Sequence, residues 1–331
     1  MERRGLEAEA VIARLVLRRL AFAVPVLGIV AFGVFLLAAA SPFDPIHQYY
    51  GVRLFDASAA DVARVRAELG LDRPVLLRFW DWFTGLLGGD LGTSRSLRQP
   101  VAQVVAERLP WTALLAATGL VIAVLLALVL GAVAAWRQGG PLDRLVTATG
   151  HALEGVPPFV LALLSIAVFS LGLGWLPVAG LTDAGRAASV SQIVEHLALP
   201  ALVLGVSQTP WLVLHVRQSM LSSLAEDHVT GARARGLAER VVVLRHALPT
   251  ALLPFVTLLG ARIPELVTGA VLVEEVFSWP GLAGALVTAA TAVDYPLLAV
   301  ITLIATAAVL LGSLLADVAA VLLDPRVAAD G

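Results

Sequence analysis

The sequence predicts an all-α integral membrane protein with six transmembrane helices, an external domain between helices one and two, and a cytoplasmic loop between helices four and five. Of the 331 residues, 59% are hydrophobic. Crossing about 30 Å of hydrocarbon takes roughly 20 apolar residues, and six runs of the chain approach that length with few charges. The predicted spans cover residues 20–43, 109–136, 145–173, 193–216, 247–273 and 295–323.

These spans divide the chain into an N-terminal segment with the first helix, an external domain, a membrane core and a tail. In the external domain, Ser58 and Gly70 are suited to begin and end one short helix. Residues 74–88, rich in aromatic side chains, predict a second helix at the level of the lipid headgroups. The four parts cover residues 1–43, 44–108, 109–323 and 324–331, and the core includes a cytoplasmic loop over residues 218–247.

The distribution of arginine predicts which helix ends face the cytoplasm. Thirteen arginines lie in four segments on one side of the predicted membrane, whereas the two short loops on the other side hold only Arg186. Because basic residues gather on the cytoplasmic side, both termini of this multi-pass plasma-membrane protein are expected in the cytoplasm. The four segments are residues 1–19, 137–144, 217–246 and 324–331.

The residue types exclude several kinds of chemistry. The chain has no cysteine, which excludes disulfides, thiolate nucleophiles and thiolate metal sites. It has no lysine, so it lacks the residue with which a P-loop contacts the terminal phosphates of ATP. The histidines have no metal-ligand spacing, and basic residues are not clustered with aromatic ones as in nucleic-acid-binding proteins. We therefore predict no catalytic residue, metal site, bound cofactor or nucleic-acid partner, and an ATP-driven function needs another chain.

The loop between the fourth and fifth predicted spans contains a distinctive pattern of helix breakers. Residues 227–235 suit a short helix along the membrane surface, and Gly236 can end it because glycine tolerates the left-handed conformation there. Residues 238–247 predict a second short helix, after which Leu248 and Pro249 begin the next membrane helix. A short rigid helix between two such breaks can act as a lever.

The spacing in this loop resembles the cytoplasmic motif of ABC importer permeases. That motif begins Glu-Ala-Ala, has a glycine after three further residues, and ends with apolar-x-Leu-Pro after nine more. Residues 230–232, Gly236 and residues 246–249 keep this spacing, although the first two positions and the apolar position are substituted. The whole chain resembles the dipeptide/oligopeptide/nickel family of these permeases, in particular its B-type (first) subunit. Further similar stretches are residues 66–74, 89–94, 100–110, 276–282, 294–296 and 322–327.

The resemblance implies a permease subunit that moves di- or oligopeptides, or a related small solute, across the bacterial inner membrane by alternating access. Its partners would be membrane lipid, a second homologous permease, two ATPase domains or subunits that hold ATP and Mg, and an external solute-binding protein. A nickel or haem importer, and an ion-coupled secondary transporter, are the alternatives. The loop residues expected to couple the permease to the ATPases are Asp227, Thr230, Gly231, Ala232, Arg233, Gly236, Leu248 and Pro249.

Two charged residues fall inside the fifth predicted span. Arg262 and Glu265 are three residues apart, so a helix places them on one face, where they can pair. A charge at the bilayer centre costs at least about 2.5–3.5 kcal/mol, and such residues usually face a protein interior or a water-filled cavity. Two interpretations follow, a lining of the translocation path and a structural ion pair.

Overall fold

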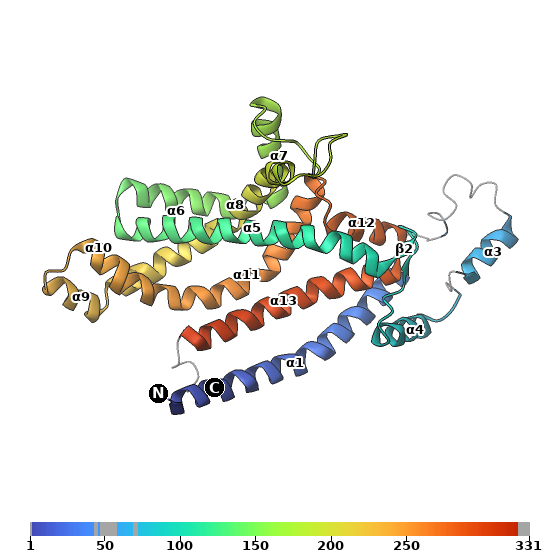
Figure 1. The fold of residues 1–331 in the computed structure, drawn as a ribbon, viewed down its shortest axis with the longest axis horizontal. Coiled ribbons are helices and arrows are strands. Elements are labelled where there is room, and N and C mark those ends of the chain that lie inside the picture. The colour runs from blue at the N-terminus through green and yellow to red at the C-terminus, as the bar shows by residue number, and fades with distance from the viewer. Residues whose placement is uncertain (1, 43–45, 47–57, 69–71, 324–331) are drawn as a thin grey trace. The chain divides into compact units, whose positions relative to one another are not determined.

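The computed structural model describes residues 2–42, 46, 58–68 and 72–323, and nearly all of them are helical (Figure 1). The first part of the chain forms α1 (Glu2–Ala39), α3 (Ala59–Glu68), α4 (Val75–Leu87), strands β1 (Thr93–Ser94) and β2 (Gln99–Pro100), and α5 (Val101–Trp136). The second part forms α6 (Pro141–Glu154), α7 (Pro158–Ser165), the π-helical η2 (Ile166–Gly172), α8 (Val190–Leu224), α9 (Asp227–Ala234), α10 (Glu239–Val241), the π-helical η3 (Val242–Ala247), α11 (Leu248–Val276), α12 (Leu282–Ala292) and α13 (Tyr295–Leu323).

Five helical segments in the described part of the chain are long and apolar enough to cross a membrane. A sixth is obtained if the bent pair of α6 and α7–η2 is one span. The all-α membrane fold predicted from the sequence is thereby confirmed. The five segments are Val11–Ala39, Val101–Trp136, Val190–Leu224, Glu239–Val276 and Tyr295–Leu322.

The third predicted span, residues 145–173, is not one straight helix. The chain bends by 107° between α6 and α7–η2. Pro157 and Pro158 cause the break: proline lacks the N–H that would continue the helix, and it forces the preceding residue into an extended conformation. Pro157 has φ −60° and ψ 143°, which is extended backbone.

Several helices extend beyond the apolar runs that predict them. Helix α5 begins at Val101, within the segment 44–108 predicted as an external domain, and α8 continues to Leu224, within the predicted loop 218–247. Hydropathy marks the part of a helix that can lie in hydrocarbon, whereas backbone hydrogen bonding continues through polar flanking turns. The predicted stop at Gly70 and the tail 324–331 lie outside the described residues.

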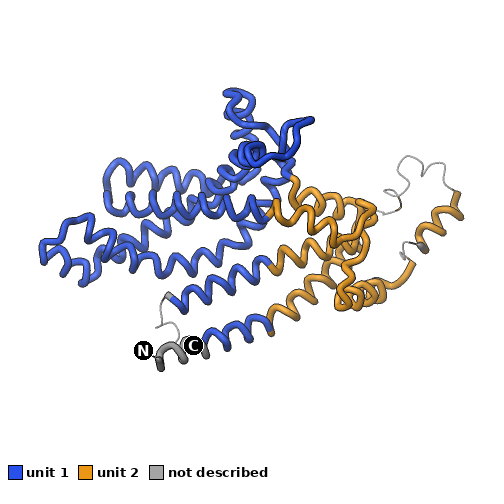
Figure 2. Tube along the Cα trace, in the orientation of Figure 1, with its two compact units in different colours: residues 1–20, 113–279, 308–331 blue, residues 21–112, 280–307 orange. Residues whose placement is uncertain are grey.

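The chain forms two compact units, coloured separately in Figure 2. Unit 1 contains residues 1–20, 113–279 and 308–331, and its most extensive helix contact joins α8 to α11. Glycines let α5 approach α8 closely: a Cβ on Gly131 would lie 2.7 Å from Cβ of Val216, and one on Gly205 would lie 2.6 Å from Cγ2 of Ile122. Small residues at such contacts are the usual means of packing helices in lipid.

Unit 2, residues 21–112 and 280–307, has an aromatic core. The ring of Phe35 lies 5.3 Å from Trp82 and 5.4 Å from Tyr295, and Phe79 packs edge-on against Phe35. The aromatic helix predicted at the headgroups therefore directs much of its aromatic surface into the protein, and Trp80 is the ring it leaves exposed.

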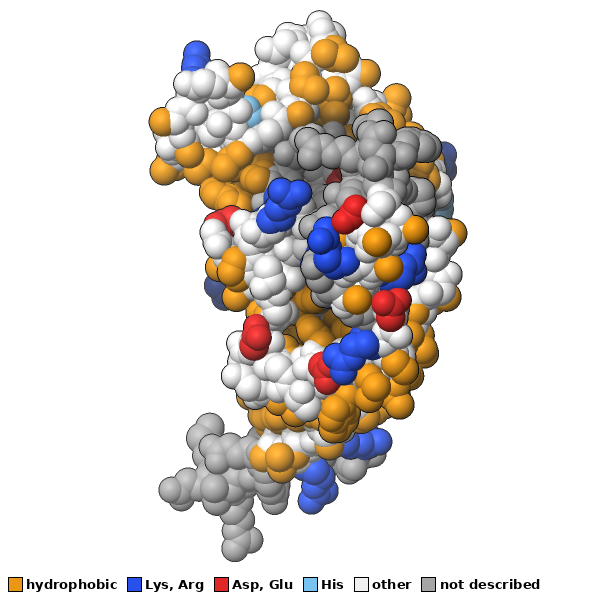
Figure 3. Space-filling view, turned by 90° about the vertical axis from the view of Figure 1, so that its right-hand side faces the viewer, with side chains coloured by type: hydrophobic (Ala, Val, Ile, Leu, Met, Phe, Trp, Pro, Cys, Tyr) orange, Lys and Arg blue, Asp and Glu red, His pale blue; other side chains and the backbone are white. Residues whose placement is uncertain are grey.

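The short helix α3 begins as the sequence predicts. The hydroxyl of Ser58 accepts a hydrogen bond from the backbone N–H of Asp61 at 3.1 Å, which is the N-cap contact. Asp61 then pairs with Arg64. The Ser58 hydroxyl in turn donates to Oδ2 of Asp61 at 2.7 Å, and this hydrogen bond lowers the pKa of the Asp61 carboxyl below its usual value. Figure 3 views the side of the molecule at the right of Figure 1 and shows basic, acidic and apolar side chains interspersed on it.

Candidate functional site

The loop between α8 and α11 presents one face of α9 to the surroundings. Asp227 and Thr230 are exposed, and Gly231 is half-buried with open space around its Cα, since a Cβ there would meet nothing within 4 Å. These positions lie on one side of a helix by their spacing. The opposite side is buried: Val229 and Ala232 are fully enclosed in the core of unit 1. Ala232, predicted to approach a partner, therefore contacts its own chain.

An ion pair holds the loop in shape across Gly236. Arg233 donates from Nη2 to Oε1 of Glu239 at 2.8 Å and from Nε to Oε2 at 3.3 Å. These hydrogen bonds to the Glu239 carboxylate raise the pKa of the Arg233 guanidinium above its usual value. Between them, Gly236 has φ +76°, the left-handed conformation predicted to end α9. The two ends of this turn are thus fixed to each other.

The loop is anchored to both of the long helices that it joins. The hydroxyl of Ser223, near the end of α8, donates to the carbonyl of Ala247 at 2.9 Å. Leu248 then begins α11 and is half-buried, while Pro249 in its first turn is exposed. The end of α8 is thus tied directly to the residue that precedes α11.

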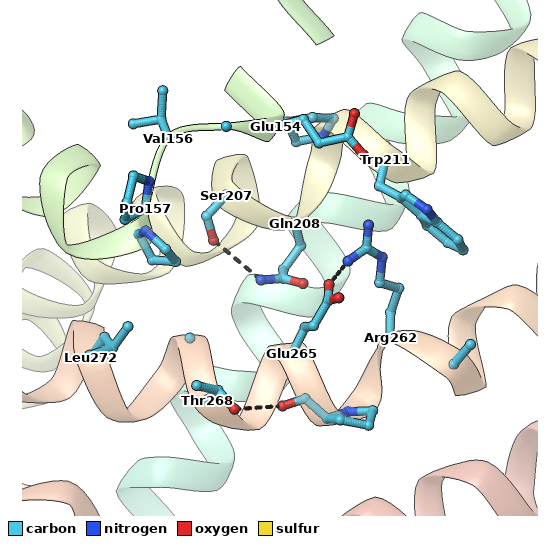
Figure 4. A pocket seen from close by; sticks show the side chains of 16 residues that line it. Glu154, Val156, Pro157, Ser207, Gln208, Trp211, Arg262, Glu265, Thr268 and Leu272 are labelled. Atoms are coloured by element: carbon cyan, nitrogen blue, oxygen red, sulfur yellow. Dashed lines mark hydrogen bonds and ion pairs between the residues drawn. The ribbon is translucent and has the colours of Figure 1, made fainter. Parts of the chain in front are cut away.

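A cavity of about 810 Å³ lies between α8, α11 and the bend that follows α6. Figure 4 shows its walls: Gln208 and Trp211 project from α8, and Arg262 and Glu265 from α11. The complete lining comprises Glu154, Gly155, Val156, Pro157, Pro158, Ser207, Gln208, Pro210, Trp211, Ala261, Arg262, Pro264, Glu265, Thr268, Gly269 and Leu272. The structure therefore brings both intramembrane charges to one cavity.

The two charges are paired, and the arginine has a second contact. Arg262 forms an ion pair with Glu265 through Nη1. Its guanidinium carbon also lies 4.1 Å from the centroid of the Trp211 ring, a cation–π contact. The exposed fraction of the side chain is 16% for Arg262 and 57% for Glu265. The arginine is thus held against the tryptophan ring, whereas the glutamate is open to the cavity.

The chain matches known families along most of its length. Residues 127–329 match the family described as “Binding-protein-dependent transport system inner membrane component”. Residues 12–116 match the N-terminal family of the same transport-system membrane components. The chain belongs to this permease family.

Known relatives of this permease align with nearly its whole length. The oligopeptide transport system permease protein AppB of Bacillus subtilis is 32% identical over 316 residues, which is 95% of this chain and 99% of AppB. The glutathione transport system permease protein GsiC of Salmonella typhimurium is 36% identical over 313 residues, 94% of this chain and 98% of GsiC. A Brucella suis protein provisionally named a peptide permease is 37% identical over 297 residues, 89% of this chain and 92% of its own length.

Sequence reasoning about this permease missed the aromatic partner of Arg262. Trp211 lies in the fourth predicted span as one apolar residue among many, and its role appears only when α8 packs beside α11. Glu154, close to the break at Pro157, also lines the cavity. Among the described residues, no three His, Asp or Glu side chains gather as a metal site.

Proposed function

We propose that this chain is the B-type permease subunit of an ABC importer for peptides in a bacterial inner membrane. It pairs with a second homologous permease, two ATPase domains that hold ATP and Mg, and an external solute-binding protein, and both of its termini are cytoplasmic. The names of AppB and GsiC, which specify oligopeptides and glutathione, favour peptides over nickel or haem as the cargo.

The observation that carries this proposal is the geometry of α9. Its exposed side offers Asp227, Thr230 and Gly231, and open space surrounds Gly231. A surface of small and polar residues suits the close approach of a partner helix or cleft. The opposite side is packed against the core of the chain, so a partner that moves α9 also moves the helices beneath it.

The mechanism follows from these connections. ATP binding closes the ATPase domains outside this chain, and their closure displaces α9. Arg233–Glu239 and Ser223–Ala247 keep the loop rigid, so the displacement reaches α8 and α11. These two helices form facing walls of the 810 Å³ cavity, and a change in their separation opens the cavity to one side of the membrane. Hydrolysis resets the arrangement.

Substitution of Gly231 tests the coupling role. Leucine has a higher helix propensity than glycine and has room at this position, so Gly231→Leu keeps the chain folded while obstructing a docking partner. We expect the variant permease to purify as a stable protein, to lose co-purifying ATPase subunits, and to lose ATP-dependent uptake. Gly28→Leu is the matched control, because Gly28 also has nothing within 4 Å. Unchanged ATPase retention and uptake in Gly231→Leu would refute the coupling role.

A further inference from the structure

The cavity beside α11 has the size and the wall chemistry of a binding site for a small polar solute. Ligand sites typically enclose about 300–1,000 Å³, and this cavity measures about 810 Å³. Apolar walls from Pro157, Pro210 and Leu272 alternate with the hydroxyl of Ser207 and the amide of Gln208. Such a lining can hold a molecule that has both apolar groups and peptide amides.

The arrangement of its ion pair differs from that of a structural ion pair. Arg262 and Glu265 belong to the same helix, three residues apart, so their contact does not join α11 to any other element. The pair is also asymmetric, with the glutamate more than half exposed. Because this ion pair does not connect two helices, either residue can change its partner without loosening the fold.

Trp211 gives the arginine a support that is independent of Glu265. The guanidinium lies over the indole ring at 4.1 Å, and the stacking remains if the glutamate turns away. Nε of Arg262 is buried without a hydrogen-bond partner among the described residues. The arginine is therefore held in place while its hydrogen-bonding capacity is only partly used.

A second carboxylate completes the set of charges. Glu154, at the end of α6, is exposed and lines the same cavity, and Figure 4 shows it across the cavity from α11. The lining thus contains one guanidinium and two carboxylates. A free peptide has one carboxylate and one ammonium group, so this lining complements both of its ends.

We propose that the cavity selects peptides by their two charged termini: Arg262 binds the carboxylate, and Glu265 with Glu154 binds the ammonium group. This inference rests on the proposed function in peptide import. On entry of the peptide, Glu265 leaves Arg262 for the ammonium group, and the solute carboxylate replaces it on the arginine. Charged hydrogen bonds of this kind are about twice as strong as neutral ones. A peptide with blocked ends leaves the Arg262–Glu265 pair intact and gains neither contact.

The test compares alanine peptides of two to five residues in three forms, namely with free ends, with an amidated C-terminus and with an acetylated N-terminus. ATP-dependent uptake is measured in proteoliposomes that contain the complete transporter and its binding protein. Selection by the binding protein is the same for every permease variant, so it cancels when the free-to-blocked uptake ratio of a variant is divided by that of the wild type. We expect Arg262→Gln to lower the free-to-amidated ratio at least tenfold, and Glu265→Gln to lower the free-to-acetylated ratio.

Asp317→Asn is the control, because Asp317 pairs with Arg19 away from the cavity lining. Its ratios should equal those of the wild type. Uptake by both cavity variants with wild-type ratios would overturn the proposed selection while leaving peptide import intact. If the wild-type complex takes up none of these peptides, the proposed function fails as well, and with it the inference that rests on it.

Discussion

The guanidinium of Arg262 lies over the indole ring of Trp211, with its central carbon 4.1 Å from the ring centroid. Two adjacent helices, α8 and α11, contribute these residues. The contact fixes a charged group at the wall of a cavity within the membrane-spanning core. A cation–π contact contributes about 0.5–2 kcal/mol, more when it is shielded from water.

Trp211→Leu should therefore weaken the selection of peptides by their carboxyl end. Without the ring, Arg262 is no longer held in position when Glu265 leaves it. We expect the preference for free over amidated alanine peptides in ATP-dependent uptake to fall several-fold, and Trp211→Phe to reduce it less. Trp80→Leu is the matched control, since Trp80 is exposed on α4. Equal preferences in Trp211→Leu and the wild type would contradict the supporting role of the ring.

A buried ion pair joins α6 to α8. Arg217 donates from Nη2 to Oδ2 of Asp143 at 2.9 Å, and the Asp143 side chain is only 5% exposed. Removing one partner of a buried pair leaves the other charge uncompensated, which costs about 3 kcal/mol. We predict that the purified complex with Asp143→Asn unfolds at a lower temperature than the wild-type complex.

Asp81→Asn serves as the comparison for that experiment. Asp81 lies 2.6 Å from Arg73, but both side chains are about half exposed, and exposed pairs contribute about 0–1 kcal/mol. Its unfolding temperature should stay close to that of the wild type. If both variants shift the transition equally, burial does not decide the strength of the Asp143–Arg217 pair.

Asp294 organises the β1–β2 hairpin from the start of α13. Its Oδ2 accepts hydrogen bonds from the hydroxyl of Ser94 at 2.7 Å, and from the backbone N–H and hydroxyl of Ser96 at 2.9 and 2.8 Å. Asp294→Leu leaves these donors without their acceptor, and each buried unsatisfied donor costs about 1–3 kcal/mol. We expect proteases to cleave near the hairpin much faster in Asp294→Leu, and at an intermediate rate in Asp294→Asn, which keeps one acceptor oxygen. Identical cleavage rates in all three proteins would rule out this anchoring role.

The contact between α5 and α8 depends on glycine. A Cβ on Gly205 would lie 2.6 Å from Cγ2 of Ile122 and 3.0 Å from the backbone oxygen of Gly119. Gly205→Ala should therefore force the helices apart and destabilise the protein by about 1–3 kcal/mol, the usual cost of overpacking. Thermal unfolding of the purified complex measures this loss. Gly28→Ala, at a position with open space, should unfold like the wild type, and a Gly205→Ala protein of wild-type stability would contradict the close packing.

The sequence predicts those features that depend on local patterns. Helix α13 begins at Tyr295 as predicted, because a long, largely apolar run begins there. Gly236 ends α9 in the left-handed conformation, because few other residues adopt it at low cost. The motif in the loop between α8 and α11 likewise depends on residue spacing along the chain.

Features that depend on contacts between distant segments were missed. Residues 145–173 are predicted as one span, because two prolines do not fix the angle of the 107° bend after α6. Hydropathy gives Trp211 the same role as its apolar neighbours, although its ring supports Arg262. The hairpin near Asp294 is too short to produce a strand pattern, and a side chain from a distant helix holds it together. The inward face of Ala232 follows from the packing of α9 on the core.

The most direct test of the central claim is uptake by the purified transporter in proteoliposomes, with and without ATP. The complete complex comprises this permease, its homologous partner, the ATPase subunits and the binding protein. We predict that it accumulates alanine peptides only when ATP is present on the ATPase side, and that omission of the ATPase subunits abolishes uptake. Uptake by this chain alone, driven by an ion gradient without ATP, would contradict the account.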